Sequence, residues 1–197
     1  MSPASVNPIW TATPRLRLRI LSPDDRAEFI RVHEISRKFF RPWTPEIPAG
    51  QTTEDQFNVQ LNRASAGIGS GTEYRFVGLL DDDRIAGFFS LSQVFRGAFE
   101  NAFAGWSVSA DVAGRGLATE AVGALLDIAF RDGPFGLNLH RVGASVIPTN
   151  LASIRVAEKN GFRREGLGVK YLKIAGQWQD HILLAKLREE HDGSKNI

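Results

Sequence analysis

The sequence contains no cysteine in its 197 residues. Disulfide bonds, thiolate metal sites and a cysteine nucleophile are therefore excluded, and the composition suits a reducing compartment. Histidine is also scarce, with four copies, and no two of them have the spacing of metal ligands. We expect a cytoplasmic protein that binds no metal.

Long apolar runs and a strong excess of one charge are absent as well. No window approaches the roughly 18 uninterrupted apolar residues of a membrane-spanning helix, and residues 1–10 do not resemble a signal peptide. The formal net charge is only +2, and the basic residues form no cluster of the kind that binds nucleic acid. Arg15, Arg17 and Arg19 alternate with apolar residues, which predicts one solvated face of a strand. We expect a soluble protein whose partners include neither membranes nor nucleic acids.

Hydrophobic residues make up 43% of the chain, and the length fits one domain with a sizeable core. Alternating apolar residues predict strands, while helical spacing behind capping residues predicts helices. The expected strands cover residues 15–21, 74–80, 84–94, 98–108, 139–147, 166–174 and 178–187, and the expected helices cover 22–39, 53–66, 117–130 and 150–160. We find no repeat or linker, so we predict one α+β domain over residues 1–197, with short loose tails and fraying from His191 onward.

Residues 108–121 join a predicted strand to an amphipathic helix through a glycine-rich turn. Gly114 and Gly116 lack a Cβ atom, so the backbone can approach a bulky anion closely. The helix that follows offers unpaired N–H groups and the positive end of its dipole. Such a turn suits a pyrophosphate, although a turn that only starts a helix would have the same composition.

Three phosphate-binding patterns can be compared with this turn. A P-loop ends in Gly-Lys-Ser/Thr, which the sequence Gly-Leu-Ala at 116–118 excludes. The dinucleotide-binding pattern needs glycine or alanine where Thr119 stands, and it opens a parallel βαβ unit, whereas antiparallel strands are expected before this turn. The third pattern is Gln/Arg-x-x-Gly-x-Gly/Ala, and the turn matches its end.

This third pattern resembles the coenzyme A loop of the GNAT N-acetyltransferase superfamily. Gly116 and Ala118 match, whereas Ala113 stands where the family usually has Gln or Arg. Farther along, residues 146–162 resemble the family's N-x-x-S…G-F segment. Asn150 in that segment could cap a helix or reach the pantetheine arm of coenzyme A.

The resemblance covers residues 15–187 and implies the GNAT fold: α+β, with a mixed, mostly antiparallel sheet of about seven strands that is splayed at its centre and has helices on both faces. It also implies acetyl-CoA as co-substrate and no metal. The pantetheine would lie in a gap between strands 98–108 and 139–147. The residues implied in cofactor binding are Trp106, Val108, Gly114, Arg115, Gly116, Leu117, Ala118, Thr119, Asn150 and Ser153.

Within the superfamily, the sequence most resembles the RimJ/RimL-type protein N-terminal acetyltransferases. The similar segments are residues 95–99, 139–141, 176–178 and 180–181. This implies a protein N-terminus, such as that of a ribosomal protein, as acceptor and a monomer or homodimer as the assembly. A small amine or antibiotic as acceptor, or a non-catalytic acyl-CoA sensor, are the alternatives.

The acceptor determines how much general base is needed. A chain N-terminus has a reference pKa of about 7.7–8.0 and a lysine about 10.4, so a weak base is enough for the former. We expect Glu100 to be that base, with an exposed hairpin carboxylate as the alternative interpretation. Glu165 is a second option, although an ion pair with Arg163 or Arg164 is the simpler one.

The sequence also suggests roles for other polar and aromatic residues. Tyr171 stands near the place where relatives have the tyrosine that protonates the leaving thiolate, with core packing as the alternative. Phe39, Phe40 and Trp43 are candidates for lining a peptide entrance. His140 and His181 are expected to make structural hydrogen bonds.

Overall fold

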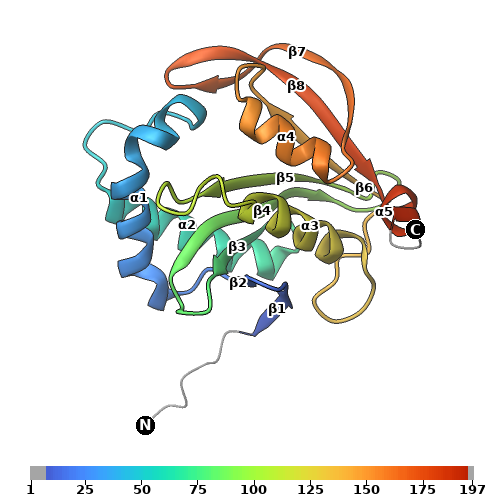
Figure 1. Ribbon diagram of the computed structural model, residues 1–197, viewed down its shortest axis with the longest axis horizontal. Coiled ribbons are helices and arrows are strands. Elements are labelled where there is room, and N and C mark those ends of the chain that lie inside the picture. The colour runs from blue at the N-terminus through green and yellow to red at the C-terminus, as the bar shows by residue number, and fades with distance from the viewer. Residues whose placement is uncertain (1–7, 195–197) are drawn as a thin grey trace.

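The computed structural model describes residues 8–194 and contains one sheet with helices on both faces (Figure 1). The expectations for the outermost tail residues, 1–7 and 195–197, lie outside the described residues. The elements are β1 Ile9–Ala12, β2 Arg17–Ile20, η1 Pro23–Asp25, α1 Arg26–Phe40, η2 Arg41–Trp43, α2 Thr53–Ser70, β3 Tyr74–Leu79, β4 Ile85–Phe95, β5 Asn101–Val108, α3 Leu117–Phe130, β6 Arg141–Val146, α4 Leu151–Lys159, β7 Arg163–Ile174, β8 Gln177–Leu187 and α5 Arg188–Ser194.

The sheet has eight strands in the order β1-β2-β3-β4-β5-β6-β8-β7. Every neighbouring pair is antiparallel except β5 and β6, which are parallel and are connected through α3. The predicted fold class is confirmed, and the additional strand is β1, whose four residues are too few for a periodic signal.

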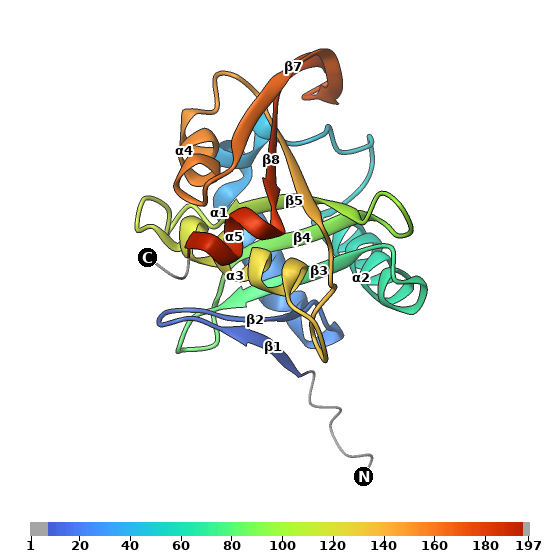
Figure 2. The same ribbon diagram turned by 90° about the vertical axis from the view of Figure 1, so that its right-hand side faces the viewer.

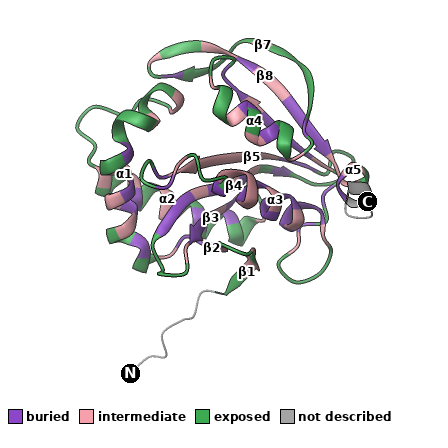
Figure 3. Cartoon of the chain, in the orientation of Figure 1, coloured by how far each residue is buried: buried purple, intermediate pink, exposed green. Residues whose placement is uncertain are grey.

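Aromatic contacts show which helices cover which face of the sheet. Phe88 on β4 packs against Phe29 of α1 at 5.0 Å between ring centroids, on the face that α1 and α2 cover. Trp106 on β5 points to the other face, and its ring centroid lies 6.4 Å from that of Phe162. Helices α3 and α4 lie on that face (Figure 2). Buried residues line both faces of the central strands (Figure 3). Among residues 8–194, no helix is both long enough and apolar enough to cross a membrane.

The parallel pair in the middle of the sheet separates soon after it forms. The pairing of β5 with β6 consists of Asn101 with Arg141, Ala102 with Val142 and Phe103 with Gly143. Beyond those positions, residues 104–108 keep their pairing with β4 but have no partner on the β6 side. The expected central splay is confirmed, and we call this V-shaped opening the wedge.

Two helix ends differ from the sequence-based expectation. Helix α2 continues through Gly67 and Gly69 to Ser70 and ends at Gly71, which has the left-handed φ of 69°. Position 67 has room only for glycine, since a Cβ there would lie 2.3 Å from the carbonyl oxygen of Glu73. The sequence analysis expects a frayed tail from His191 onward. In the structure, the chain is helical as far as Ser194, where α5 ends.

The arginines of the first predicted strand lie on its more exposed side, as expected, and each of them forms an ion pair. Arg19 forms an ion pair with Asp25 at 2.6 Å, and both side chains are largely withdrawn from solvent. Arg17 pairs with Asp83, and Arg15 pairs with Glu120 on α3. The alternation thus reflects one row of ion pairs that ties β2 to its neighbours.

Candidate active site

The glycine-rich turn leads directly into the N-terminus of α3. Gly116 is the residue before the helix and has φ 80°, and Gly114 has φ 79°, a region that residues with a side chain rarely adopt. No side chain caps α3, so the amides of Leu117, Ala118 and Thr119 have no acceptor from a cap. An ideal Cβ at Gly114 would meet nothing within 4 Å. Open backbone donors at a helix N-terminus are the chemistry that binds a phosphate group.

The first turn of α3 is fixed to the N-terminal part of the chain through Glu120. Its carboxylate accepts hydrogen bonds from the Thr13 hydroxyl at 2.6 Å and from the Arg15 backbone amide at 2.9 Å. The Arg15 guanidinium also donates to the carbonyl of Arg115 at 2.8 Å. Burial raises the pKa of Glu120, but hydrogen bonds from Thr13 and Arg15 outweigh it, so the pKa lies below its usual value. The carboxylate stays charged and holds the turn in place.

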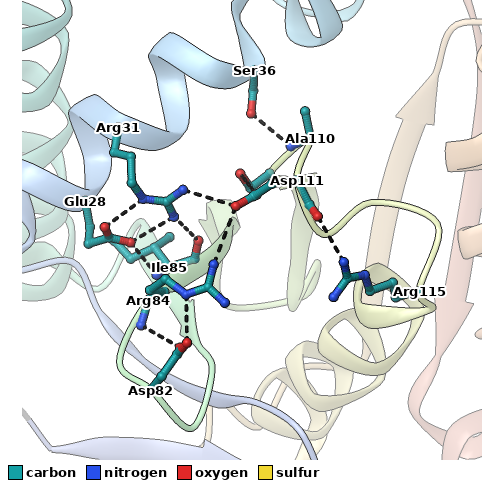
Figure 4. Close-up of polar contacts among 10 residues, drawn as sticks. Glu28, Arg31, Ser36, Asp82, Arg84, Ile85, Ala110, Asp111 and Arg115 are labelled. Atoms are coloured by element: carbon teal, nitrogen blue, oxygen red, sulfur yellow. Dashed lines mark hydrogen bonds and ion pairs between the residues drawn. The ribbon is translucent and has the colours of Figure 1, made fainter.

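The stem of the same turn is anchored by a network of charges (Figure 4). Asp111 accepts a hydrogen bond from Arg31 of α1 at 3.2 Å, and Arg84 lies 3.7 Å from the same oxygen. Arg31 is itself held by Glu28 at 2.7 Å. Next to Asp111, the amide of Ala110 donates to the fully buried hydroxyl of Ser36 on α1 at 3.0 Å. Helix α1 therefore fixes the start of the turn.

The backbone of β5 is open toward the wedge. The amide of Ser109 donates to Ala86 on β4, so the backbone groups of every second residue before it also point to β4. Those of Ala104, Trp106 and Val108 point to the opposite edge, where pairing with β6 has ended. These groups can bind an extended amide-containing chain as another strand would.

Side chains beside the wedge also fit such a ligand. The indole Nε1 of Trp106 is buried and has no hydrogen-bond partner in the described structure. The Oδ1 of Asn150 caps α4 by accepting from the Ser153 amide at 3.1 Å, as predicted. That bond leaves the Nδ2 group of Asn150 without a hydrogen-bond partner among the described residues, so capping and ligand binding are compatible.

A cavity of about 970 Å³ lies on the face of the sheet that α1 and α2 cover. Its walls come from α1, η2 and the loop after it, α2, β5 and the tip of the β7–β8 hairpin. The hairpin tip is held there because the amide of Ala175 donates to the Thr44 carbonyl at 3.1 Å. Ser107 is the β5 residue in the wall, between Trp106 and Val108. The cavity, on one face of the sheet, and the wedge, along the free edge of β5, therefore meet at the same stretch of this strand.

Comparison with known proteins decides the family. The model of the acetyltransferase (GNAT) domain matches residues 15–163. The chain belongs to the GNAT acetyltransferase family. A Bacillus subtilis protein named "Probable N-acetyltransferase YjcK" is 35% identical over 89% of this chain and 95% of its own. The [Ribosomal protein uS5]-alanine N-acetyltransferase of Escherichia coli is 29% identical over 92% of both chains.

A solved structure of this family is similar at the level of the whole fold. Mycobacterium smegmatis RimJ, crystallised with CoA-disulfide, has a TM-score of 0.80 at 30% identity and covers 89% of this chain and 83% of its own. The GNAT fold and an N-acetyltransferase activity are thereby established for this chain, and its relatives include RimJ-type ribosomal-protein acetyltransferases.

The expected catalytic residues of this GNAT enzyme lie apart from the meeting point. Glu100 is exposed and precedes β5, at the end where β5 and β6 are still paired, and its carbonyl accepts from the amides of His140 and Arg141. Residues along a strand rise about 3.3 Å each, so the Glu100 backbone is roughly 20 Å from that of Ser107. Tyr171 lies half-exposed on edge strand β7, which is separated from β5 by β6 and β8, and its ring lies 5.8 Å from that of His181. Neither role is tested by this geometry, and neither residue lines the cavity.

Other expectations are resolved by the contacts. Glu165 pairs with Arg141 and Arg163, and the hydrogen bond from Arg141 lowers the pKa of its carboxyl, which makes it an ion-pair partner. His181 is buried, and its Nδ1 lies 3.0 Å from the Gln179 carbonyl, as predicted, whereas no bond is found for the His140 side chain among the described residues.

The peptide entrance expected at three aromatic residues stays a prediction, and the structure places one of the three at the cavity. Phe40 lines the cavity, while Phe39 and Trp43 do not. Among the cavity residues that the sequence analysis did not single out is His33, on α1. A single histidine in a helix carries no motif, so only its three-dimensional setting distinguishes it.

Proposed function

We propose that this GNAT enzyme transfers the acetyl group of acetyl-CoA to the α-amino group of a protein N-terminus. The observation that carries the proposal is the meeting of the wedge and the cavity at residues 106–108 of β5. A donor bound along the free edge of the strand and an acceptor in the cavity on one face of the sheet would bring thioester and amine together. Positioning of this kind supplies a large part of catalysis in two-substrate reactions.

The donor assignment rests on the chemistry of the turn and the wedge. Residues 114–119 offer open amides and a helix N-terminus for the diphosphate, and the β5 edge offers amide and carbonyl groups for the pantetheine. Arg115 lines a smaller hollow of about 350 Å³ on the outer side of the turn, together with Arg15. Asp81 and Asp82 line it as well, and Arg15 is paired with Glu120, so Arg115 is the cation that suits the remaining phosphate of coenzyme A.

The charges of the cavity favour a peptide terminus over a polyamine. Arg37 and Arg41 line it and make no ion pair with any described residue, whereas Arg63 is paired with Glu73. Glu46 is the carboxylate in the wall. A polycation would be repelled by the unpaired arginines, while a peptide brings one amine whose ammonium form these charges destabilise. A neighbouring cation thus raises the neutral fraction of the acceptor amine.

The decisive experiment is a thiol-release assay with acetyl-CoA. Peptides that begin with Ala, Ser or Met are compared with spermidine and an aminoglycoside at equal concentration. The proposal expects turnover with a peptide terminus and little with the polycations. Turnover with the small amines alone would favour the alternative acceptor class, and binding of acetyl-CoA without any turnover would favour a sensor. A cytoplasmic location stays a prediction of the cysteine-free composition.

A further inference from the structure

We propose that His33 is the general base of the reaction, and that its Nε2 takes the proton of the acceptor ammonium in the cavity beside β5. This inference rests on the proposed function, because it requires an amine acceptor in that cavity. It places the role of general base, which the sequence analysis expects at Glu100, on a residue of a different element. The argument follows from the position of the ring, its tautomer and its surroundings.

The position of His33 follows from the sheet register. Its ring lies 5.0 Å from that of Phe88 on β4, and Phe88 is paired with Ser107 on β5. Side chains of directly paired residues in an antiparallel sheet lie on the same face. His33 therefore lies over the part of β5 where the wedge opens, and it lines the same cavity as Ser107.

The tautomer follows from one hydrogen bond. Nδ1 of His33 lies 2.9 Å from the carbonyl oxygen of Phe29, and a carbonyl can only accept, so Nδ1 carries the hydrogen. In the neutral ring, Nε2 then has a free lone pair. Nε2 makes no hydrogen bond within the described structure. It is also not one of the fully buried side-chain atoms that lack a hydrogen-bond partner, so it is accessible. Nε2 is thus a proton acceptor open to the cavity.

The ring is held rigidly in this orientation. It stacks on Phe29 with 3.9 Å between centroids and an interplanar angle of 21°, and Phe40 meets it edge-on at 5.9 Å. A ring that is stacked on one side and hydrogen-bonded at Nδ1 loses little freedom when an acceptor arrives. Preorganisation of this kind is what a general base requires.

The burial of the ring favours its neutral form. The groups that line the cavity with it are Arg37 from α1, Arg41 from η2, Arg63 from α2 and Glu46 from the following loop, while β4 and β5 contribute no charge. Burial lowers the pKa of His33 below its ordinary value, and the hydrogen bond to Phe29 opposes this only in part. The imidazole is therefore unprotonated at neutral pH and ready to accept a proton.

The transfer balances with no further reagent. The acceptor ammonium gives one proton to Nε2, and the neutral nitrogen then forms a bond to the acyl carbonyl carbon. The carbon–sulfur bond breaks, the second nitrogen-bound proton goes to the leaving thiolate, and the imidazolium returns its proton to water through the open cavity. The products are the acetylated amine, the thiol and one proton.

The test uses two substitutions of His33 and one control. His33→Phe keeps an aromatic ring between Phe29 and Phe88 but has no proton acceptor, and His33→Gln keeps a polar group without a base. Both should reduce kcat/KM for an N-terminal peptide by about 10²- to 10⁴-fold, the usual contribution of a positioned base. The affinity for acetyl-CoA, measured by calorimetry, should stay unchanged. His140→Gln, a histidine outside the cavity, should keep wild-type activity.

The pH profile separates catalysis from packing. The wild type should show two ionisations in kcat/KM, one from the acceptor amine and one from His33, and both variants should show only that of the amine. Retention of wild-type kcat/KM in His33→Phe, or an unchanged profile, would overturn the assignment. A wild-type enzyme that acetylates no peptide terminus would instead break the proposed function itself.

A third measurement uses the wild-type enzyme, so it tests the proposal even if the variants do not fold. Wild-type enzyme is treated with diethyl pyrocarbonate, and mass spectrometry follows each histidine. Activity should fall in step with modification of His33, and an acceptor peptide should protect that residue. Full activity after complete modification of His33 would refute the proposal.

Discussion

The two sides of β5 are built from different kinds of groups. On the wedge side, the groups available to a ligand are mainly backbone amides and carbonyls, at residues 114–119 and along the free edge of the strand. On the cavity side, they are side chains brought by three helical segments, a loop, a strand and a hairpin tip. The first kind of site depends on chain conformation, and the second depends on which elements meet. This difference explains what each side can tolerate and how readily each can be recognised.

The largest effect is expected from a substitution that disturbs the backbone of the glycine-rich turn on the wedge side of β5. Gly116→Val forces a β-branched residue into φ 80°, and strain of that kind costs roughly 1–3 kcal/mol, or about 5- to 150-fold in affinity. We expect the turn to shift and acetyl-CoA to bind correspondingly more weakly in calorimetry. The control is Gly69→Val, at a helical position where an added Cβ meets nothing within 4 Å. Equal affinity in Gly116→Val and the wild type would show that the turn is not part of the donor site.

The next effect alters the cavity side through charge. Replacing Arg37 and Arg41 with glutamate should change the preference between acidic and basic N-terminal peptides by about 5- to 30-fold, since each exposed charge pair contributes up to roughly 1 kcal/mol. The ratio of kcat/KM values for the two peptides measures this, and added salt should reduce it. Lys38→Glu, on the same helix but outside the cavity, is the matched control. An unaffected ratio would mean that acceptors do not reach these arginines.

A smaller effect distinguishes the two functions assigned to Asn150. Asn150→Ala should lower the free energy of unfolding by about 1 kcal/mol through loss of the α4 cap, whereas Asn150→Asp should keep the cap. The aspartate variant lacks the amide donor, so KM for acetyl-CoA should rise by about 2- to 10-fold at unchanged melting temperature. An aspartate variant with wild-type KM would leave capping as the role of this residue.

The smallest effect concerns the network that joins the two sides. The hydrogen bond from Arg31 lowers the pKa of Glu28, so this pair stabilises the fold above the unfolded carboxyl value, and the contribution is lost as pH falls through the folded value. Arg31→Met should therefore destabilise the protein at pH 7 by about 0.5 kcal/mol, and the difference should shrink in acid. Denaturant unfolding at several pH values from neutral to acidic checks it. A difference that persists undiminished in acid would contradict this origin.

The comparison also explains what could be predicted from the sequence. The turn at Gly114 and Gly116 was recognisable because a backbone site needs glycines at fixed spacing before a helix, and the capping role of Asn150 was likewise local. The acceptor side could not be recognised in the same way, because His33, Arg37 and Ser107 are joined only by the packing of α1 on β4 and β5. The role of Glu100 stays a prediction, since its place beside a strand does not tell which end of that strand the wedge opens at.

The position of helix α1 has a consequence for how binding of one substrate affects binding of the other. Its Ser36 and Arg31 hold the stem of the turn that we propose binds the diphosphate, while His33 and Arg37, within about the same two turns of helix, line the cavity that we propose for the acceptor. Under that proposal, the two substrates share one helix as a common wall. If the first substrate to arrive displaces or steadies α1, the affinity for the second changes by a factor that thermodynamic reciprocity makes identical in either order of addition.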